Sequence, residues 1–360
     1  MKIAITLTTI NIPYVIKDYI ENIKKFSHKD IEFIIVSDNK TPEGAKDYTE
    51  TLTKRFGIKI NYLDLKFQKE YLKRFQELEN YLPYNSFARR NIGDMFAYEE
   101  GFDIIIRVDD DNYPTEEDFI SFHKKIGKKI DINVVSSTSG WFNICSELVD
   151  ANSVEFYPRG YLYNKRWIES SINVNNKSVK LILNAGLWLG DPDIDAITRL
   201  ARPIDAIKYK RSYGDLFALE KNTWSPINTQ NTAYSREIIP AAFVPPNVGR
   251  YDDIWSGYLL RSISDHFDEY VSYGSPLLYQ NRNVHNLWDD LNKELNGNIF
   301  TKHFIDVIKS IEFKKKSYIE CYYELAEFLD ANIDENKKIF SGVTEGMKIW
   351  TESINKLNLK

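Results

Sequence analysis

Cysteine is almost missing from this 360-residue chain, which contains only Cys145 and Cys321. Two cysteines exclude a disulfide framework and a cysteine metal cluster. The five histidines are scattered and lack the HxxxH spacing of a zinc site. The sequence therefore predicts neither a disulfide-stabilised scaffold nor a zinc site of the usual spacing.

Long apolar runs are also missing, and none approaches the roughly 18–20 residues that span a bilayer. The N-terminus enters a strand-like run at residues 2–7 without the architecture of a signal peptide. Basic and acidic side chains nearly balance, 47 against 52, so bulk charge gives no support for nucleic-acid binding. We therefore expect a cytoplasmic protein with no transmembrane segment and no nucleic-acid partner.

Glycine-rich phosphate loops are the third absence. No G-x-G-x-x-G follows the first apolar run, and no G-x-x-x-x-G-K-[ST] occurs anywhere in the chain. These absences argue against a dinucleotide-type Rossmann site and exclude a P-loop enzyme. A bound phosphate group must then be neutralised by a metal ion and by basic side chains.

The first third of the chain alternates between two hydrophobic periods. Strands are expected over residues 3–9, 31–36 and 58–63, and helical patterns cover residues 14–26 and 41–56. This β-α-β-α-β order is typical of a doubly wound parallel sheet. Residues 65–101 are expected to be mostly helical and residues 115–130 to form a helix. Residues 140–183 have no clear pattern, except that the aromatic and basic segment 157–166 is expected to form a loop or hairpin.

Three polar positions follow from this arrangement. Asp38, at the end of the second strand, lies where such folds hold a ribose or a base edge. Arg89 and Arg90 precede the next apolar run, and a guanidinium group matches phosphate oxygens in a bidentate manner. We expect one of them, assigned to Arg89, to contact a diphosphate; the alternative is an exposed basic turn.

The apolar run Ile104–Val108 ends in three consecutive carboxylates, Asp109, Asp110 and Asp111. In an extended chain Asp109 and Asp111 share one side and Asp110 faces the other. Three adjacent negative charges at the end of a buried strand indicate a divalent cation, which can also carry a diphosphate. The alternative is a solvated acidic turn before a capped helix.

Two further acidic segments occur later. Asp191, Asp193 and Asp195 alternate, so they would face one side of an extended segment. Asp252 and Asp253 follow a glycine turn at the expected start of a helix, where carboxylates are favoured electrostatically. Each of the last two therefore has a structural alternative to a functional role.

Taken together, these segments resemble the reversibly glycosylated polypeptide family, whose best-known members are UDP-arabinopyranose mutases. The resemblance covers roughly residues 1–300. It is carried by Ile106–Asp111, by Arg159-Gly160-Tyr161 with Arg166, by a G-L-W-L-x-x-P-D-x-D-A-x-T-x-L block from Gly186 to Leu200, and by a G-R-Y-D-D-x-W-x-G block from Gly249 to Gly257.

The resemblance implies an α/β glycosyltransferase-A fold, Rossmann-like, with a mostly parallel sheet flanked by helices over residues 1–300 and a helical C-terminal extension over residues 301–360. It implies that the acidic triplet binds Mn²⁺ or Mg²⁺ and the diphosphate of a UDP-sugar. Carried over residue by residue, Asp109 and Asp111 are metal ligands and Asp109 and Asp110 contact the nucleotide.

Further roles follow from the same resemblance. Arg159 corresponds to the arginine that becomes glycosylated in the family, and Arg166 to a second arginine required for activity. Asp38 is expected near the uracil, with Thr9 at the end of the first strand. The sequence departs from the family where a W-H-S-K segment is replaced by residues 279–282, Tyr-Gln-Asn-Arg. His285, a few residues later, is a candidate third metal ligand.

Three hypotheses for the function are open. In a mutase-like reaction the UDP-sugar is held near Arg159 while its ring changes between pyranose and furanose forms. In a transferase a carbohydrate or other acceptor attacks, with Asp252 or Asp253 as the base. In both, Asp193, Asp195 or Asp252 would stabilise an oxocarbenium-like sugar. The third is a non-catalytic partner subunit of a mixed hetero-oligomer, against which the intact triplet argues. Independently of the reaction, the sequence is compatible with a homo- or hetero-oligomer.

Overall fold

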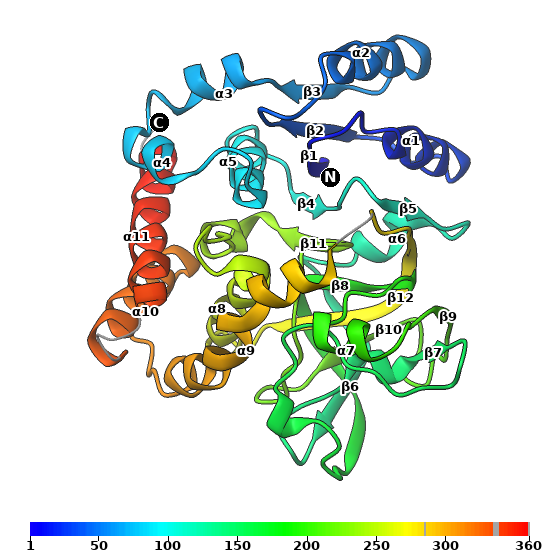
Figure 1. Ribbon diagram of the computed structural model, residues 1–360, viewed down its shortest axis with the longest axis vertical. Coiled ribbons are helices and arrows are strands. Elements are labelled where there is room, and N and C mark those ends of the chain that lie inside the picture. The colour runs from blue at the N-terminus through cyan, green and yellow to red at the C-terminus, as the bar shows by residue number, and fades with distance from the viewer. Residues whose placement is uncertain (284–285, 334–337, 359–360) are drawn as a thin grey trace.

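The computed structural model describes residues 1–283, 286–333 and 338–358, and a twelve-stranded mixed sheet with helices on its faces runs through them (Figure 1). The strands are β1 Ile3–Thr9, β2 Ile31–Ser37, β3 Ile60–Leu63, β4 Ile104–Arg107, β5 Asn112–Pro114, β6 Lys129–Ser137, β7 Leu148–Asp150, β8 Ile172–Gly190, β9 Ala206–Tyr209, β10 Leu216–Leu219, β11 Thr232–Ser235 and β12 Tyr270–Gln280.

The helices vary from single 3-10 turns to long α-helices. They are α1 Val15–Lys25, α2 Gly44–Phe56, α3 Leu65–Leu72, α4 Gln76–Tyr81, η1 Phe87–Arg89, α5 Arg90–Glu99, α6 Phe119–His123, η2 Ile144–Glu147, η3 Tyr163–Lys165, α7 Ala196–Ala201, η4 Arg236–Ala241, η5 Gly249–Tyr251, α8 Asp252–His266, α9 Leu287–Lys309, α10 Tyr318–Asn332 and α11 Lys338–Asn358. None of those described combines the length and apolarity that a membrane crossing requires.

The N-terminal part of the sheet is parallel, in the order β3-β2-β1-β4. The apolar side chains of β1, β2 and β4 are buried, because helices cover both faces of a parallel sheet. Strands β1, β2 and β4 all run in one direction, so Thr9, Ser37 and Arg107 end at the same edge. The α/β class and the first three predicted strands are confirmed.

The remainder of the sheet is mixed, which corrects the expectation of a mostly parallel sheet. Strand β11 runs antiparallel to both β4 and β8, and β12 runs parallel to β8 but antiparallel to β5 and β10. Because antiparallel neighbours bring opposite strand ends to one edge, the start of β11 lies beside the end of β4: Thr232 pairs with Arg107. Segments distant in the sequence therefore meet where the acidic triplet begins.

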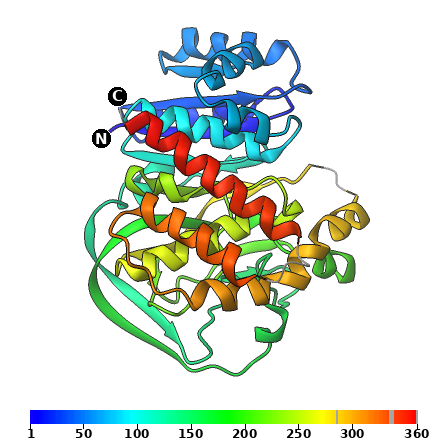
Figure 2. The same cartoon turned by 90° about the vertical axis from the view of Figure 1, so that its left-hand side faces the viewer.

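One local expectation needs correction: the predicted helix over residues 115–130 is limited to α6, and β6 already begins at Lys129. The loop expected over residues 157–166 is confirmed and contains η3. The part of residues 140–183 without an assignment includes the start of β8, a 19-residue strand that pairs antiparallel with β6. Figure 2 shows this pair as a long curved ribbon. The first part of β8, Ile172–Ser178, is mostly polar and largely exposed. It therefore lacks the apolar run by which the sequence would predict a strand.

The predicted C-terminal helical extension is confirmed, and α10 and α11 lie across one side of the molecule (Figure 2). Trp255 of α8 stacks on Phe304 at a centroid distance of 4.3 Å and on Phe340 at 5.1 Å. Trp350 donates a 3.1 Å hydrogen bond to the carbonyl of Pro240. The C-terminal helices thus support α8, the helix whose first turn carries Asp252 and Asp253.

Candidate functional site

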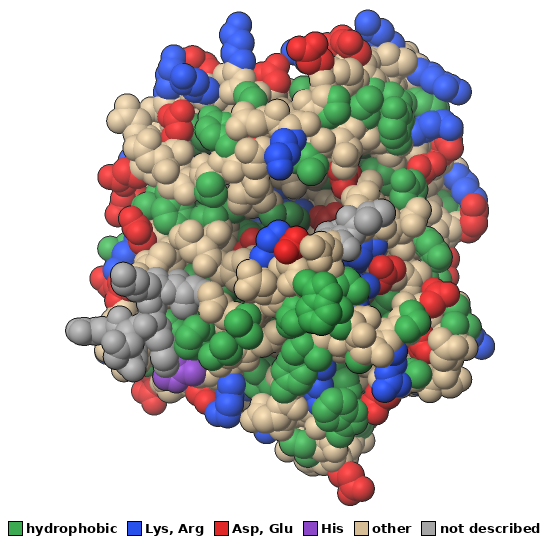
Figure 3. Space-filling model, viewed as in Figure 1, with side chains coloured by type: hydrophobic (Ala, Val, Ile, Leu, Met, Phe, Trp, Pro, Cys, Tyr) green, Lys and Arg blue, Asp and Glu red, His purple; other side chains and the backbone are tan. Residues whose placement is uncertain are grey.

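The acidic triplet lies between two adjoining cavities at the end of β4. Asp109 and Asp111 line the first, here called the inner cavity, with a volume of about 210 Å³. Asp110 lines the second, the strand-end cavity, with a volume of about 230 Å³. The opposite orientation of Asp110 is the one that an extended chain predicts. Figure 3 shows acidic and basic side chains around a hollow near the centre of this face.

The strand-end cavity brings together all four remaining side chains predicted to bind a nucleotide: Thr9, Asp38, Arg89 and Asp110. The hydroxyl of Thr9 donates a 2.6 Å hydrogen bond to Asp110, which joins the ends of β1 and β4. Asp38 accepts a 3.2 Å hydrogen bond from the backbone N–H of Ser86. These contacts hold the carboxylates of two neighbouring loops at fixed positions.

The two consecutive arginines have different partners. The guanidinium group of Arg89 contacts Gln68, through a 2.9 Å hydrogen bond from Nε, and lies over the ring of Tyr84. Arg90 instead donates a 2.8 Å hydrogen bond to Asp109 of the triplet. The sequence assignment to Arg89 alone therefore missed Arg90, whose charge is directed at the inner cavity.

The carboxylates that face the inner cavity carry crowded negative charge. Burial raises the pKa of Asp109, although Arg90 lowers it. Burial, followed by repulsion from Asp109 and Asp110, raises the pKa of Asp111 to about 7. Two half-buried carboxylates facing one cavity are a fitting pair of oxygen ligands for a divalent cation, which would relieve this repulsion.

No group of three or more His, Cys, Asp and Glu side chains suited to a metal ion occurs within residues 1–283, 286–333 and 338–358. A cation at Asp109 and Asp111 would accordingly take its other ligands from water, from amide oxygens or from a bound diphosphate. The proposed third ligand, His285, lies outside the described residues.

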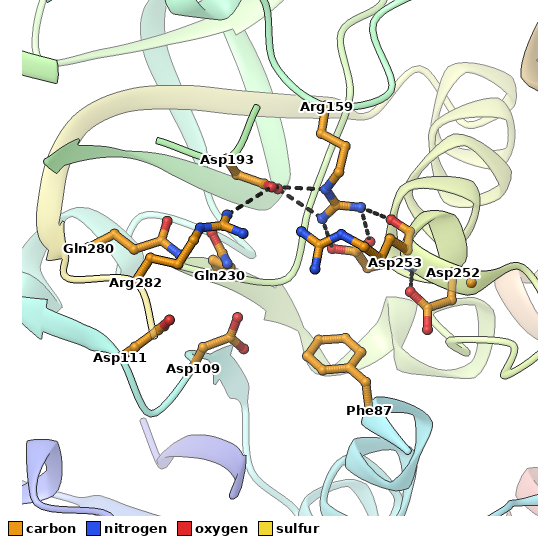
Figure 4. Close-up of a pocket in the computed structure, with 12 residues that line it drawn as sticks. Phe87, Asp109, Asp111, Arg159, Asp193, Gln230, Asp252, Asp253, Gln280 and Arg282 are labelled. Carbon is orange, nitrogen blue, oxygen red and sulfur yellow. Dashed lines mark hydrogen bonds and ion pairs between the residues drawn. The ribbon is translucent and has the colours of Figure 1, made fainter. Parts of the chain in front are cut away.

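Across the inner cavity, Arg159 is clamped between Asp193 and Asp253 (Figure 4). Its Nε and Nη2 donate 2.9 Å hydrogen bonds to the two carboxylate oxygens of Asp193. Its Nη1 and Nη2 donate to Asp253 at 3.0 and 3.1 Å, and Nη1 also contacts the carbonyl of Arg250. All three guanidinium nitrogens are thus engaged.

The clamp has a clear effect on ionisation. Burial alone would lower the pKa of Arg159, but Asp193 and Asp253 raise it well above its ordinary value. Burial alone would raise the pKa of Asp193, but Arg159 holds it well below the usual range. Arg159 and Asp193 are therefore both charged at neutral pH.

Asp252 begins α8 and lines the same cavity. Its burial, together with the neighbouring charge of Asp253, raises its pKa to about 7. A carboxylate with this pKa can take up and release a proton near neutral pH. Among the predicted catalytic residues, Asp252 has the ionisation best suited to acid–base chemistry.

Arg166 and Asp195 do not line the inner cavity. Arg166 donates a 2.7 Å hydrogen bond to Asp195, and the hydroxyl of Tyr163 donates another of 2.7 Å. Asp195 also caps α7 through the backbone N–H of Thr198. The expectation that Asp191, Asp193 and Asp195 face one side is wrong for Asp195, which pairs with Arg166 and caps α7 where the chain turns. Asp191 and Asp193 still share a partner, Arg282.

Sequence reasoning missed five side chains that line the inner cavity: Phe87, Gln230, Arg250, Gln280 and Arg282. Gln230 precedes β11, and Gln280 and Arg282 come at the end of β12. Their positions at strand ends are a signal, but only the antiparallel pairing of these strands shows that they reach the triplet.

Comparison with known protein families gives a match over nearly the whole chain. Residues 3–359 match the family described as "Reversibly glycosylated polypeptide". UDP-arabinopyranose mutase 3 from Arabidopsis thaliana is 30% identical over 210 residues, which cover 56% of this chain and 54% of that protein. UDP-arabinopyranose mutase 1 from Oryza sativa subsp. japonica is 27% identical over the same length, with the same coverage. The chain spans about half the length of the curated relatives it matches.

Solved structures give more distant likenesses. Glucosyl-3-phosphoglycerate synthase from Mycobacterium tuberculosis, in complex with Mn²⁺ and UDP-glucose, has a TM-score of 0.42 at 12% identity, covering 87% of this chain and 80% of that one. A mannosyltransferase from Pyrobaculum calidifontis, in complex with GDP-mannose and Mn²⁺, has a TM-score of 0.42 at 9% identity, covering 99% and 87%. With the family match extending over nearly its entire length, this chain belongs to the reversibly glycosylated polypeptide family.

Proposed function

We propose that this protein is a divalent-metal-dependent enzyme that interconverts the pyranose and furanose forms of a UDP-sugar. Family membership and the similarity to UDP-arabinopyranose mutases support a UDP-sugar mutase. The observation that carries the proposal is the division of the acidic triplet between two adjoining cavities. One substrate could extend through both, with its diphosphate beside the triplet.

In this proposal the strand-end cavity holds the nucleoside and the inner cavity holds the sugar. Asp38 and Thr9 would fix the nucleoside at the parallel strand ends, where such sheets bind nucleotides. Phe87 lines both cavities and would mark the boundary between nucleoside and sugar. Arg89 lies on the nucleoside side and Arg90 on the side of Asp109.

Asp109 and Asp111 would hold Mn²⁺ or Mg²⁺. When bound, the cation supplies positive charge that stabilises the departing diphosphate. The chain's own part is to keep both carboxylates directed into the cavity, which Arg90 does for Asp109 through its 2.8 Å hydrogen bond. The raised pKa of Asp111 supports this assignment, because a carboxylate crowded by like charge gains from a cation.

The remaining charges would act on the sugar. Asp252 would accept the proton of a sugar hydroxyl while that oxygen bonds to the anomeric carbon and the original ring oxygen's bond to the same carbon breaks. The freed ring oxygen then takes up a proton and becomes the new hydroxyl. Asp193, held charged by Arg159, would stabilise positive charge that develops on the sugar. Arg166 and Asp195 would act indirectly, by positioning the segment that carries Asp193.

Self-glycosylation at Arg159 belongs to the same proposal. A guanidinium group must lose a proton before it attacks an anomeric carbon, and both clamp carboxylates oppose that loss. Glycosylation of Arg159 would therefore require the clamp with Asp193 and Asp253 to open. A mass increase confined to a peptide containing Arg159 would support that opening.

A glycosyltransferase is the second candidate. The pKa of about 7 at Asp252 supports it, since the same carboxylate could deprotonate an acceptor hydroxyl instead of a hydroxyl of the substrate sugar. In that case the inner cavity must admit the acceptor as well as the transferred sugar.

One assay separates the candidates. The purified protein is incubated with UDP-arabinopyranose and Mn²⁺, and the products are separated by chromatography and weighed by mass spectrometry. A new UDP-pentose isomer supports the mutase, whereas UDP release that requires an added carbohydrate acceptor supports the transferase. Nucleotide binding without any turnover supports a non-catalytic subunit. Asp111→Asn serves as the matched negative control, and absence of any UDP binding contradicts all enzyme proposals.

A further inference from the structure

Three buried polar atoms of the inner cavity lack hydrogen-bond partners within the part of the chain that the structure describes. They are Oε1 of Gln230, Oε1 of Gln280 and Nε of Arg282. Gln280 is 2% exposed and Gln230 is 9% exposed. Burying a polar atom without a partner costs free energy, so such atoms usually acquire one from a ligand or from water.

Two buried amides elsewhere in this protein show how fully such groups can be paired. Gln68 is fully buried, donates to the carbonyls of Ser37 and Leu63 at 2.8 and 2.6 Å, and accepts from Arg89. Asn228 donates a 2.9 Å hydrogen bond to Asp193. Within the described residues Oδ1 of Asn112 also lacks a partner, but Asn112 does not line the inner cavity, whereas Gln230 and Gln280 do.

The backbone of Gln280 is held on both sides. Gln280 pairs with Asn112 of β5 on one side and with Gly190 of β8 on the other. Its carbonyl accepts a 3.2 Å hydrogen bond from the backbone N–H of Asp191. Two residues later, Arg282 lies 3.6 Å from Asp191 and 3.8 Å from Asp193. Strand pairing thus fixes the backbone of Gln280 at the cavity wall, where a bound ligand can reach its amide oxygen.

The three atoms present two acceptors and one donor. Figure 4 shows Gln230, Gln280 and Arg282 gathered on one side of the inner cavity, facing Arg159, Asp252 and Asp253. A phosphate group in its dianionic form has no hydrogen to donate to an amide oxygen. A hydroxyl group both donates and accepts, so adjacent hydroxyls can satisfy all three atoms.

We infer that Gln230, Gln280 and Arg282 position the sugar ring by its hydroxyl groups and thereby select among UDP-sugars. This inference rests on the proposed function, because it assigns the inner cavity to the sugar. The side chains act as positioning residues and take no part in bond making. A site built to bind a hydroxyl discriminates strongly against an analogue that lacks it, because its own polar groups are then left unpaired.

The test uses Gln280→Leu and Gln230→Leu in the full-length protein, with exposed Gln76→Leu on α4 as the matched control. Isothermal titration calorimetry measures the Kd values for UDP, for the UDP-sugar that wild type turns over, and for its monodeoxy analogues. We expect each cavity variant to bind the UDP-sugar about tenfold more weakly, and Gln280→Leu to bind UDP alone as tightly as wild type. Gln230→Leu also removes an amide that contacts Asp109, so its loss for the UDP-sugar should exceed its loss for UDP alone. At least one deoxy analogue should lose no further affinity in each variant.

A second readout separates substrate positioning from a structural role. Because Oε1 of Gln280 has no partner, its removal should leave the Tm of the unliganded protein unchanged or higher. A lower Tm accompanied by weaker UDP binding would overturn the inference in favour of a structural glutamine. Weaker Mn²⁺ binding without nucleotide would overturn it in favour of a metal ligand.

The outcomes also distinguish this inference from the proposed function. If wild type binds no UDP-sugar, both fail. If wild type binds and converts a UDP-sugar while both leucine variants bind it equally well, the inference alone fails. Equal losses for the parent sugar and every deoxy analogue would likewise contradict recognition through hydroxyls.

Discussion

The two cavities beside the acidic triplet are built in different ways. The strand-end cavity is formed by loops that follow neighbouring parallel strands, and its carboxylates are held by hydroxyl and backbone N–H donors such as Thr9 and Ser86. The inner cavity draws on residues from 87 to 282, and its arginines are matched against buried carboxylates. Substitutions in the inner cavity should therefore lower the stability of the whole fold, whereas substitutions in the strand-end cavity should have only local effects.

Arg159 offers the largest test of this difference. Arg159→Met leaves Asp193 and Asp253 buried without their common partner, and breaking such a clamp costs about 3–5 kcal/mol. The free energy of unfolding, measured by urea denaturation, should fall by that amount, and turnover should be lost. Arg211→Ala, at a half-exposed ion pair with Glu117, should cost about 1 kcal/mol or less. Similar losses for the two variants would contradict the comparison.

Asp111→Asn and Asp110→Asn test whether the two sides of the acidic triplet have different roles in UDP binding. Since metal affinity depends steeply on the number of charged ligands, Asp111→Asn should weaken Mn²⁺-dependent UDP binding on the order of 100-fold. Asp110→Asn, which faces Thr9, should weaken UDP binding to a smaller extent with or without Mn²⁺. Calorimetric titrations with UDP, in the presence of Mn²⁺ and of EDTA, measure both. If Asp110→Asn abolishes the Mn²⁺ dependence instead, the assignment of sides is wrong.

The pH dependence of turnover tests Asp252. Its raised pKa means that the carboxyl group is protonated, and unable to accept a proton, below about pH 7. As a base it should make kcat/KM rise with pH through about 7 and be about tenfold lower at pH 6 than at pH 8. Asp252→Asn should remove this step along with most activity. A profile that falls through the same pH range would assign Asp252 the role of acid.

Thr9→Val should have the smallest effect. It removes the 2.6 Å hydrogen bond to Asp110 while nearly preserving side-chain volume. The expected loss is about 1 kcal/mol, equivalent to about fivefold in UDP affinity. A global decrease in Tm comparable with that of Arg159→Met would show that the strand-end cavity is as strongly coupled to the fold as the inner one.

The same difference explains what could be predicted from the sequence. Alternating strands and helices locate Thr9, Asp38 and Asp110, because parallel strand ends share one edge whatever the rest of the chain does. The pairing of β11 and β12 cannot be read in this way. The identity of Gln230 and Gln280 as cavity residues depends on antiparallel neighbours more than 100 residues from the triplet.

The sequence also did not reveal which residues the charged side chains contact. Arg89 and Arg90 are adjacent in the sequence, and no pattern there indicates that the first contacts Gln68 and the second contacts Asp109. The alternating Asp191, Asp193 and Asp195 indicated one acidic face, but a helix cap at Asp195 turned the chain. Sequence patterns specify which side chains are charged; the packing of distant segments decides which charges meet.

The clamp around Arg159 also constrains how this protein can evolve. Replacing Arg159, Asp193 or Asp253 alone leaves a charge buried without its partner. An evolutionary path through any single replacement therefore includes a destabilised protein. The three positions should accordingly be inherited as a set, and a related chain that lacks one of them should show a compensating change at the other two.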